Sequence, residues 1–139
     1  MIQIIAGDKG KGKTKILIDK VNIDVKESKG SIVYLDKNTK HMYELNNKIR
    51  LINVRDYCIE DPNEFLGFIC GLIAGDHDLQ KIYLDSFLKL ACTNNLDMER
   101  ILQKIELIST KFEVDFVISI SMNKDELPEF AKKYVVGSL

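Results

Sequence analysis

The sequence has few of the residues that mark disulfide-rich, zinc-binding or multidomain proteins. It contains three cysteines in 139 residues, and Cys58, Cys70 and Cys92 lie far apart without a C-x-x-C pair. This spacing excludes a recognisable zinc site or disulfide framework and predicts buried or inert thiols in a reducing cytosol. Only two prolines occur and no low-complexity segment interrupts the chain, so we expect one domain over residues 1–139.

Strong net charge and long apolar runs are also lacking. The formal net charge of −1 gives no indication of nucleic-acid binding over a broad surface, although it leaves a local basic groove open. The most apolar window, Phe65 to Ala74, is shorter than the roughly 18 residues that a membrane helix needs. No basic segment precedes the apolar run at Ile2, so we expect no signal peptide, no membrane span and a cytoplasmic location.

The most informative stretch lies near the start of the chain and reads Gly7-Asp8-Lys9-Gly10-Lys11-Gly12-Lys13-Thr14. Its spacing fits G-x-x-x-x-G-K-[ST], the phosphate-binding P-loop or Walker A motif. The apolar run at 2–6 predicts a buried strand before it, and residues 13–28 predict a helix after it, which is the setting that the motif requires. The residues predicted to bind a nucleoside triphosphate are Gly7, Asp8, Lys9, Gly10, Lys11, Gly12, Lys13, Thr14 and Lys15.

The chemistry of phosphate binding explains these residue types. Gly7, Gly10 and Gly12 allow positive φ and a close approach of the backbone to an anion, on which the loop amides and the helix dipole converge. Lys13 would supply a charge to the β- and γ-phosphates and so act in catalysis, and the Thr14 hydroxyl would be a ligand of Mg²⁺.

Strands and helices are expected to alternate along the whole chain. Asp61, Pro62 and Glu64 have the pattern of an N-cap, a first helical residue and a capping box. The helix that follows is apolar over much of its circumference, so we expect it to be well buried. The pattern predicts a single-domain α/β fold with a five-stranded, mostly parallel sheet and helices on both faces. The expected strands are 2–6, 31–35, 49–54, 81–85 and 114–120, and the expected helices are 13–28, 62–74, 96–111 and a last one including Phe130, Ala131, Tyr134 and Val135.

Two of the expected strands end in Tyr-Leu-Asp, at Asp36 and Asp85. A Walker B aspartate ends an apolar strand and holds Mg²⁺ opposite the P-loop hydroxyl. The other aspartate could orient a water or accept a proton from a substrate, or it could be a plain turn residue. Ser119, Ser121 and Asn123 end the last expected strand, where they would either sense the γ-phosphate or cap the final helix.

On these motifs the chain resembles the P-loop NTPase superfamily, most closely its RecA-like and thymidine-kinase-like branch. It resembles more weakly the small bacterial ATP-binding proteins named after the twitching-motility ATPase PilT. The resemblance implies ATP and Mg²⁺ as ligands and places Walker B at Asp85, after two further strands. Asp36 then becomes a candidate catalytic base.

The chain also departs from this pattern. Ser86 follows Asp85 where thymidine kinases of this type have a catalytic glutamate, and neither their zinc site nor their lasso loop is recognisable. Asn123-Lys124-Asp125 matches only part of the guanine-recognition motif N-K-x-D, so guanine binding is not supported.

Further candidates for catalysis are few. An arginine finger would come from Arg50, Arg55 or Arg100, with Arg55 best placed after a strand, or from a partner protein or a second copy of the chain. A surface ion pair is the alternative use for these arginines. His41 and His77 are expected to be loop residues.

Three functions remain open from the sequence. The first is slow, Mg²⁺-dependent hydrolysis of ATP, with catalysis by electrostatic stabilisation. The second is a small-molecule or nucleoside kinase whose acceptor pocket is covered by the polar loop 37–47. The third is an interaction module that switches with the bound nucleotide and has no significant turnover.

Overall fold

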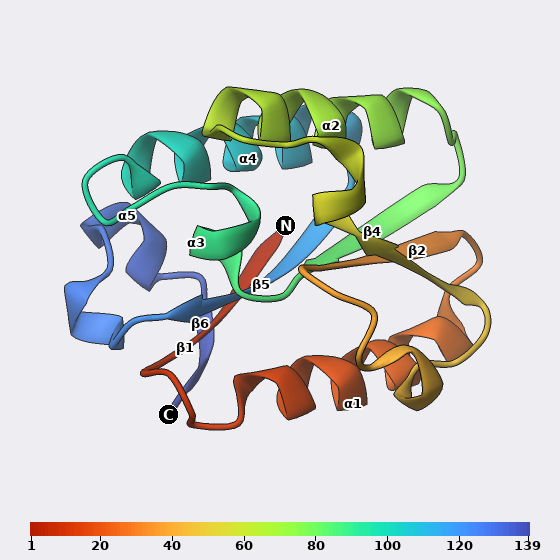
Figure 1. The fold of residues 1–139 in the computed structure, drawn as a ribbon, viewed down its shortest axis with the longest axis horizontal. Helices are drawn as coiled ribbons and strands as arrows, with labels where there is room; N and C mark the ends of the chain where they lie inside the picture. Colours follow the sequence, from red (N-terminus) through yellow and green to blue (C-terminus); the bar gives the residue numbers. More distant parts are fainter.

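The computed structural model describes residues 1–139, and its centre is a six-stranded sheet (Figure 1). The strand order is β3-β2-β4-β5-β1-β6, and all five strand pairs are parallel. The carboxyl ends of the strands therefore meet at one edge of the sheet. The strands are β1 (Ile2–Gly7), β2 (Ser31–Asp36), β3 (Ile49–Asn53), β4 (Leu79–Leu84), β5 (Asp115–Ser121) and β6 (Val135–Ser138).

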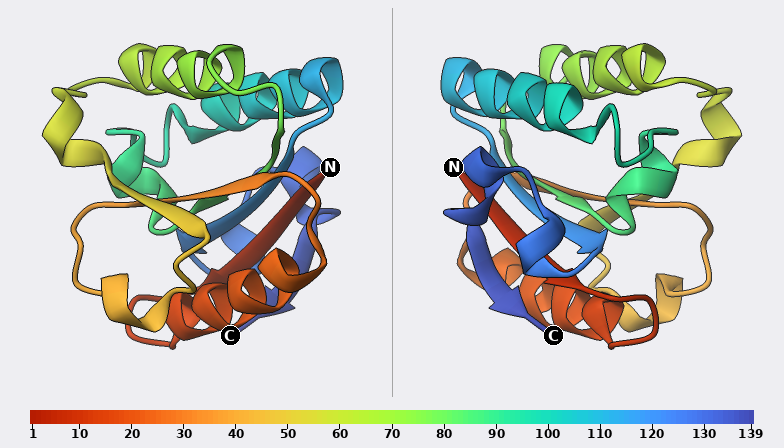
Figure 2. Two further views of the ribbon diagram at one scale, coloured as in Figure 1. Left: turned by 90° about the vertical axis from the view of Figure 1, so that its right-hand side faces the viewer. Right: turned by 90° about the vertical axis from the view of Figure 1, so that its left-hand side faces the viewer.

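Helices cover both faces of this sheet, as expected (Figures 1 and 2). The long helix α1 packs on one face, and α2 and α4 lie side by side on the other. The helices are α1 (Lys13–Glu27), α2 (Pro62–Ala74), α3 (Phe87–Leu90), α4 (Met98–Phe112) and α5 (Glu129–Lys132), and short 3₁₀ turns span Met42–Glu44, Val54–Tyr57 and Lys124–Glu126.

The inner strands are apolar over most of their length because both faces of the sheet are covered. In β2, Tyr34 belongs to the hydrophobic cluster under α1, whereas Val33 and Leu35 belong to the larger cluster under α2 and α4. Successive side chains of a strand point to opposite faces, so one apolar run supplies both cores. This explains why the five expected strands could be located from apolar runs alone.

The expectation of five strands was wrong, because the chain ends in a sixth. Tyr134 and Val135 were assigned to a last helix, but α5 ends at Lys132 and β6 begins at Val135. The backbone N–H of Ile4 donates to the carbonyl of Tyr134, and the N–H of Leu139 donates to that of Ala6, at 2.9 Å in both cases. β5 pairs with one edge of β1, and this short segment pairs with the other edge. It becomes a strand through this tertiary contact, which local sequence propensity cannot predict.

Helix α2 begins as predicted, but it is less buried than expected. The Asp61 side chain accepts a hydrogen bond from the Glu64 N–H at 2.9 Å, with Pro62 at the first helical position. Phe65, Leu66 and Ile69 are buried, whereas the outer side of the helix exposes Gly67, Cys70, Gly71 and Ala74. These residues are small, so they made that side of the helix apolar in the sequence although they expose little apolar surface to water.

Of the two alternatives for the thiols, buried or inert, burial was wrong, because Cys58, Cys70 and Cys92 are all exposed. None of them forms a disulfide, which agrees with the absence of a cysteine framework. Among the helices, none combines the length and the apolar character needed to cross a lipid bilayer.

Candidate functional site

The glycine-rich loop borders a polar cavity at the carboxyl ends of the strands, where open parallel sheets bind their ligands. The cavity has a volume of about 390 Å³, and no apolar side chain lines it. Its lining comes from the segments that follow β1, β2 and β4 and from the last residue of β5. The lining residues are Lys9, Gly10, Gly12, Lys13, Thr14, Lys37, Lys40, Asp85, Ser86, Lys89 and Ser121.

Two glycines give the loop its shape, and the third has a different role from the one predicted. Gly10 and Gly12 both have φ near +86°, a backbone conformation that residues other than glycine rarely adopt. Gly7 has no positive φ; a Cβ there would lie 2.9 Å from the Leu139 Cβ, so glycine is needed for close packing. Gly12 also precedes α1, whose first turn has neither a side-chain cap nor an acidic residue, which leaves its amides open to an anion.

Lys13 folds back over the loop. Its Nζ donates to the Asp8 carbonyl oxygen at 2.9 Å, and the residue is only 7% exposed although it lines the cavity. Burial lowers the pKa of Lys13, and the nearby charges of Asp85 and Asp8 oppose that shift. A buried ammonium that bonds to a single carbonyl can still donate to a phosphate.

The Thr14 hydroxyl and the Asp85 carboxylate, predicted from distant parts of the chain, meet at the cavity. Thr14 Oγ1 donates to Asp85 Oδ1 at 3.1 Å, and the same carboxylate oxygen accepts from Ser119 Oγ at 3.0 Å. Asp85 is 2% exposed, and the hydroxyls around it offset the cost of burying its charge. The Ser86 N–H donates to Ser119 Oγ at 2.8 Å, so Ser119 connects the ends of β4 and β5.

Tyr34 fixes the second oxygen of Asp85, a role that the sequence did not suggest. Its hydroxyl donates to Asp85 Oδ2 at 3.0 Å from the neighbouring strand β2. Burial and the Asp85 charge raise the pKa of Tyr34, which keeps the hydroxyl protonated as a donor. The ring stacks on that of Tyr83 with a centroid separation of 6.0 Å, so the donor is held in place.

Asp36 lies near the site but does not line the cavity. One of its oxygens accepts from the Lys37 N–H at 2.7 Å, while Oδ2 is buried without a partner. Burial raises the pKa of Asp36, and the charge of Asp85 adds to that shift. A carboxyl with a raised pKa and a free oxygen has the properties of a proton acceptor, but the atom is covered in this structure.

The buried state of Asp36 predicts that its charge destabilises the fold. Asp36→Asn should raise the free energy of unfolding at pH 7 by about 1 kcal/mol, because the amide keeps an oxygen for the Lys37 N–H and carries no charge. The folded pKa lies above the usual 3.8, so stability of the wild type should fall as the pH rises from that value through the folded pKa. The difference between wild type and variant should vanish below about pH 3.8.

Urea unfolding across this pH range measures both effects. Asp78→Asn, at an exposed turn, is the matched control and should change stability little at any pH. A less stable Asp36→Asn variant at pH 7 would contradict the prediction.

The remaining loop residues divide between the cavity and the solvent. Lys9 lines the cavity, but Lys11 does not. The Lys15 side chain pairs with Asp19 at 3.0 Å, and Lys15 does not line the cavity. Three cavity residues were missed, Lys37, Lys40 and Lys89. The position of Lys37 directly after the strand end at Asp36 is the signal that could have identified it.

No arginine or histidine lines this cavity. Arg100 forms an ion pair with Asp97 at 3.0 Å, and His41 pairs with Glu44 outside the cavity. Ser121 lines the cavity, whereas Asn123 caps the 3₁₀ turn at 124–126 by accepting the Asp125 N–H at 3.0 Å. Asn123 therefore has a capping role, but at this turn and not at the last helix, which begins at Glu129.

The protein side chains at this site are too few to hold a metal ion alone, but they suit one that also binds the phosphates of a nucleotide. Thr14 and Asp85 offer one hydroxyl and one carboxylate in contact, and no group of three metal-binding side chains occurs anywhere in the structure. Mg²⁺ commonly binds through one or two carboxylates and the phosphates of a substrate. The residues present fit a Mg²⁺ that arrives with a nucleotide.

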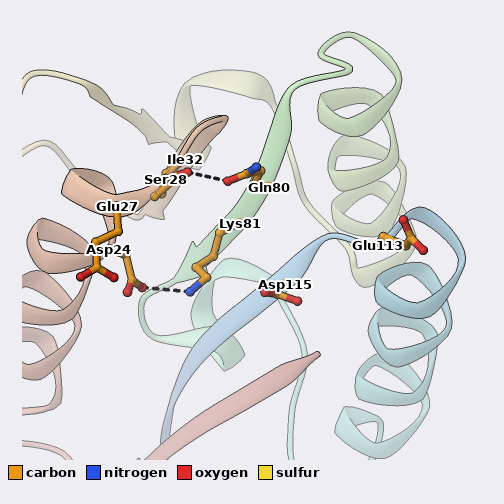
Figure 3. Close-up of a pocket in the computed structure, with 8 residues that line it drawn as sticks. All are labelled: Asp24, Glu27, Ser28, Ile32, Gln80, Lys81, Glu113 and Asp115. Atoms are coloured by element: carbon orange, nitrogen blue, oxygen red, sulfur yellow. Dashed lines mark hydrogen bonds and ion pairs between the residues drawn. The ribbon is translucent and has the colours of Figure 1, made fainter.

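A second polar cavity lies at the opposite edge of the sheet, at the amino ends of β2, β4 and β5 (Figure 3). Lys81 pairs with Asp24 at 3.0 Å, and Ser28 Oγ donates to Gln80 at 2.6 Å. The acidic side chains point in different directions, and Glu113 stands apart from the Asp24 pair. Four of the lining side chains bond to one another and Asp115 pairs with the N-terminal ammonium at 2.9 Å, so this cavity is a weaker candidate than the one at the glycine loop.

Comparison with known proteins supports the fold. Neither a protein-family model nor a curated protein sequence matches the chain. Among solved structures, the flagellar accessory protein FlaH from Methanocaldococcus jannaschii is similar, with a TM-score of 0.60 and 16% sequence identity. The match covers 93% of this chain but 63% of FlaH, so the chain spans less than two thirds of that protein. At this identity the similarity concerns the α/β fold alone.

Proposed function

We propose that the chain is a P-loop protein of the NTPase superfamily that binds ATP together with Mg²⁺. One observation carries the proposal: Thr14 Oγ1 and Asp85 Oδ1 lie 3.1 Å apart beside Lys13, in a cavity closed by the glycine loop. These residues come from the two motifs that the sequence singled out independently. A hydroxyl, a carboxylate, a lysine and open helix amides are the groups that a Mg²⁺-bound triphosphate requires.

In this proposal the protein residues stabilise charge on the phosphates. The amides of the loop and Lys13 would contact the phosphate oxygens, and the open start of α1 would add its dipole. Thr14 and Asp85 would hold Mg²⁺, which neutralises part of the phosphate charge when it is bound. Tyr34 and Ser119 would keep the Asp85 carboxylate in one orientation through their hydrogen bonds.

We expect the isolated protein to hydrolyse ATP well below the range of about 1–100 s⁻¹ typical of kinases. Ser86 occupies the place of a glutamate base, and its hydroxyl is not a base at neutral pH without activation. Asp36 is the remaining candidate base, but it is 1% exposed and outside the cavity lining. No arginine lines the cavity, so an arginine that stabilises the transition state would have to come from a partner or a second copy.

Steady-state phosphate release by the purified protein tests this expectation, with Lys13→Ala as the blank. Binding of ATP with Mg²⁺ should be measured in the same preparation, so that slow turnover is distinguished from an empty site. Turnover of several per second by the protein alone would contradict the expected rate. Absence of ATP binding would overturn the proposed function itself.

A further inference from the structure

The cavity contains more positive charge than the predicted triphosphate site uses. Lys9 and Lys13 belong to the glycine loop, but three further lysines line the same space. We call Lys37, Lys40 and Lys89 the distal lysines. Asp85 is the only carboxylate in the lining, so the cavity is strongly positive.

The distal lysines have no acidic partners. The lysine ion pairs of the structure involve Lys15, Lys81 and Lys132, all outside this cavity. The charges of Lys9 and Lys37 lower the pKa of Lys89 although that side chain lies at the surface. The ammonium groups of Lys9, Lys37 and Lys89 thus repel one another, and a bound anion would relieve this repulsion.

The position of β2 in the sheet separates the backbone of Lys37 and Lys40 from the glycine loop. Lys37 and Lys40 follow β2, which lies three strands away from β1, or about 14 Å at the usual spacing of strands. The Lys37 Nζ donates to Ser86 Oγ at 3.1 Å, which directs the ammonium to the end of β4. Lys89 lies in α3, just after the same strand end.

A nucleotide bound as proposed would make its phosphate and Mg²⁺ contacts without the distal lysines. The loop amides and Lys13 serve the β- and γ-phosphates, and Thr14 and Asp85 serve Mg²⁺, which also reduces the charge of the triphosphate. We propose that the distal lysines form a second anion site, which binds the phosphate group of a phosphomonoester while ATP occupies the glycine loop. This inference rests on the proposed function and names the chemical class of a second ligand.

The test fills the nucleotide site before the second site is probed. Wild-type protein is first saturated with Mg²⁺ and adenylyl imidodiphosphate, a non-hydrolysable ATP analogue, so that a γ-phosphate is already in place. Methyl phosphate is then titrated, and its binding is followed by ³¹P nuclear magnetic resonance. We expect saturable binding that weakens by at least about tenfold in the double variant Lys37→Ala/Lys89→Ala, because two charge-assisted contacts are lost.

The matched control is Lys104→Ala/Lys111→Ala, which removes the same charge from α4, outside the cavity. It should bind methyl phosphate within about twofold of the wild type, since distant exposed charges are screened. An equal loss in both double variants would overturn the site, and so would the absence of methyl phosphate binding to the loaded wild type.

Affinities for the analogue and for ADP separate the remaining explanations. The Lys37→Ala/Lys89→Ala variant should bind both nucleotides within about twofold of the wild type, because their contacts come from the glycine loop. If the variant lost affinity for the analogue but not for ADP, the distal lysines would contact the γ-phosphate. That result would overturn the second site but support the proposed function. Failure of the wild type to bind the analogue would overturn both.

Discussion

Lys13→Ala should lose most of the rise in melting temperature that ATP and Mg²⁺ cause in the wild type. At a ligand concentration of 100 Kd that rise corresponds to about 2.7 kcal/mol of linkage, or several degrees for a domain of this size. The variant lacks the buried ammonium that lies 2.9 Å from the Asp8 carbonyl and faces the cavity. Removal of a charge-assisted phosphate contact weakens the nucleotide complex directly.

Differential scanning fluorimetry with and without ATP and Mg²⁺ measures the shift, and each variant is compared with its own ligand-free form. Lys11→Ala is the matched control, because Lys11 is in the same loop but does not line the cavity. It should keep most of the shift. If Lys13→Ala kept the full ATP-induced shift, the assignment of the loop as a triphosphate site would be wrong.

Asp85→Asn should weaken Mg²⁺-dependent nucleotide binding by at least about tenfold, and by more than Asp36→Asn does. Asp85 contacts the Thr14 hydroxyl and lines the cavity, whereas Asp36 is covered and bonds to the Lys37 N–H. An amide in place of the Asp85 carboxylate removes the negative charge that a hard cation such as Mg²⁺ prefers.

Nucleotide titrations with Mg²⁺ and with a chelator, for both variants, separate the metal-dependent part of the affinity. Binding without Mg²⁺ serves as the internal control for folding and should change less in Asp85→Asn than binding with Mg²⁺. A larger loss of Mg²⁺-dependent binding in Asp36→Asn would mean that the two strand ends have exchanged roles.

The sequence located the elements of the fold whose signals are local. Continuous apolar runs identified five strands, and Asp61, Pro62 and Glu64 identified the start of α2, because these patterns report backbone preference and burial directly. The strand at Val135–Ser138 was missed because its four residues become a strand only through pairing with β1.

The site could be predicted only in part for a similar reason. The spacing of Lys13 and Thr14 and the strand ends at Asp36 and Asp85 can be recognised along the chain. The contact between Tyr34 and Asp85 depends on β2 and β4 being neighbours, and the sequence does not state the strand order. The same holds for Lys37 and Ser86, which are 49 residues apart and meet across that strand pair.

The strand order also sets when the glycine loop can take its shape during synthesis. Strand β1 is made before the other strands, yet its neighbours in the sheet are β5 and β6, which begin at Asp115 and Val135. A nascent chain that stops before Asp115 therefore carries the loop on a strand without a neighbour, and closing these distant pairings is slow. Asp85 likewise lacks the Ser119 hydroxyl until β5 has been added. A nucleotide that binds as proposed would thus find its loop only after β5 and β6 have been made, and it would stabilise the completed sheet rather than guide its assembly.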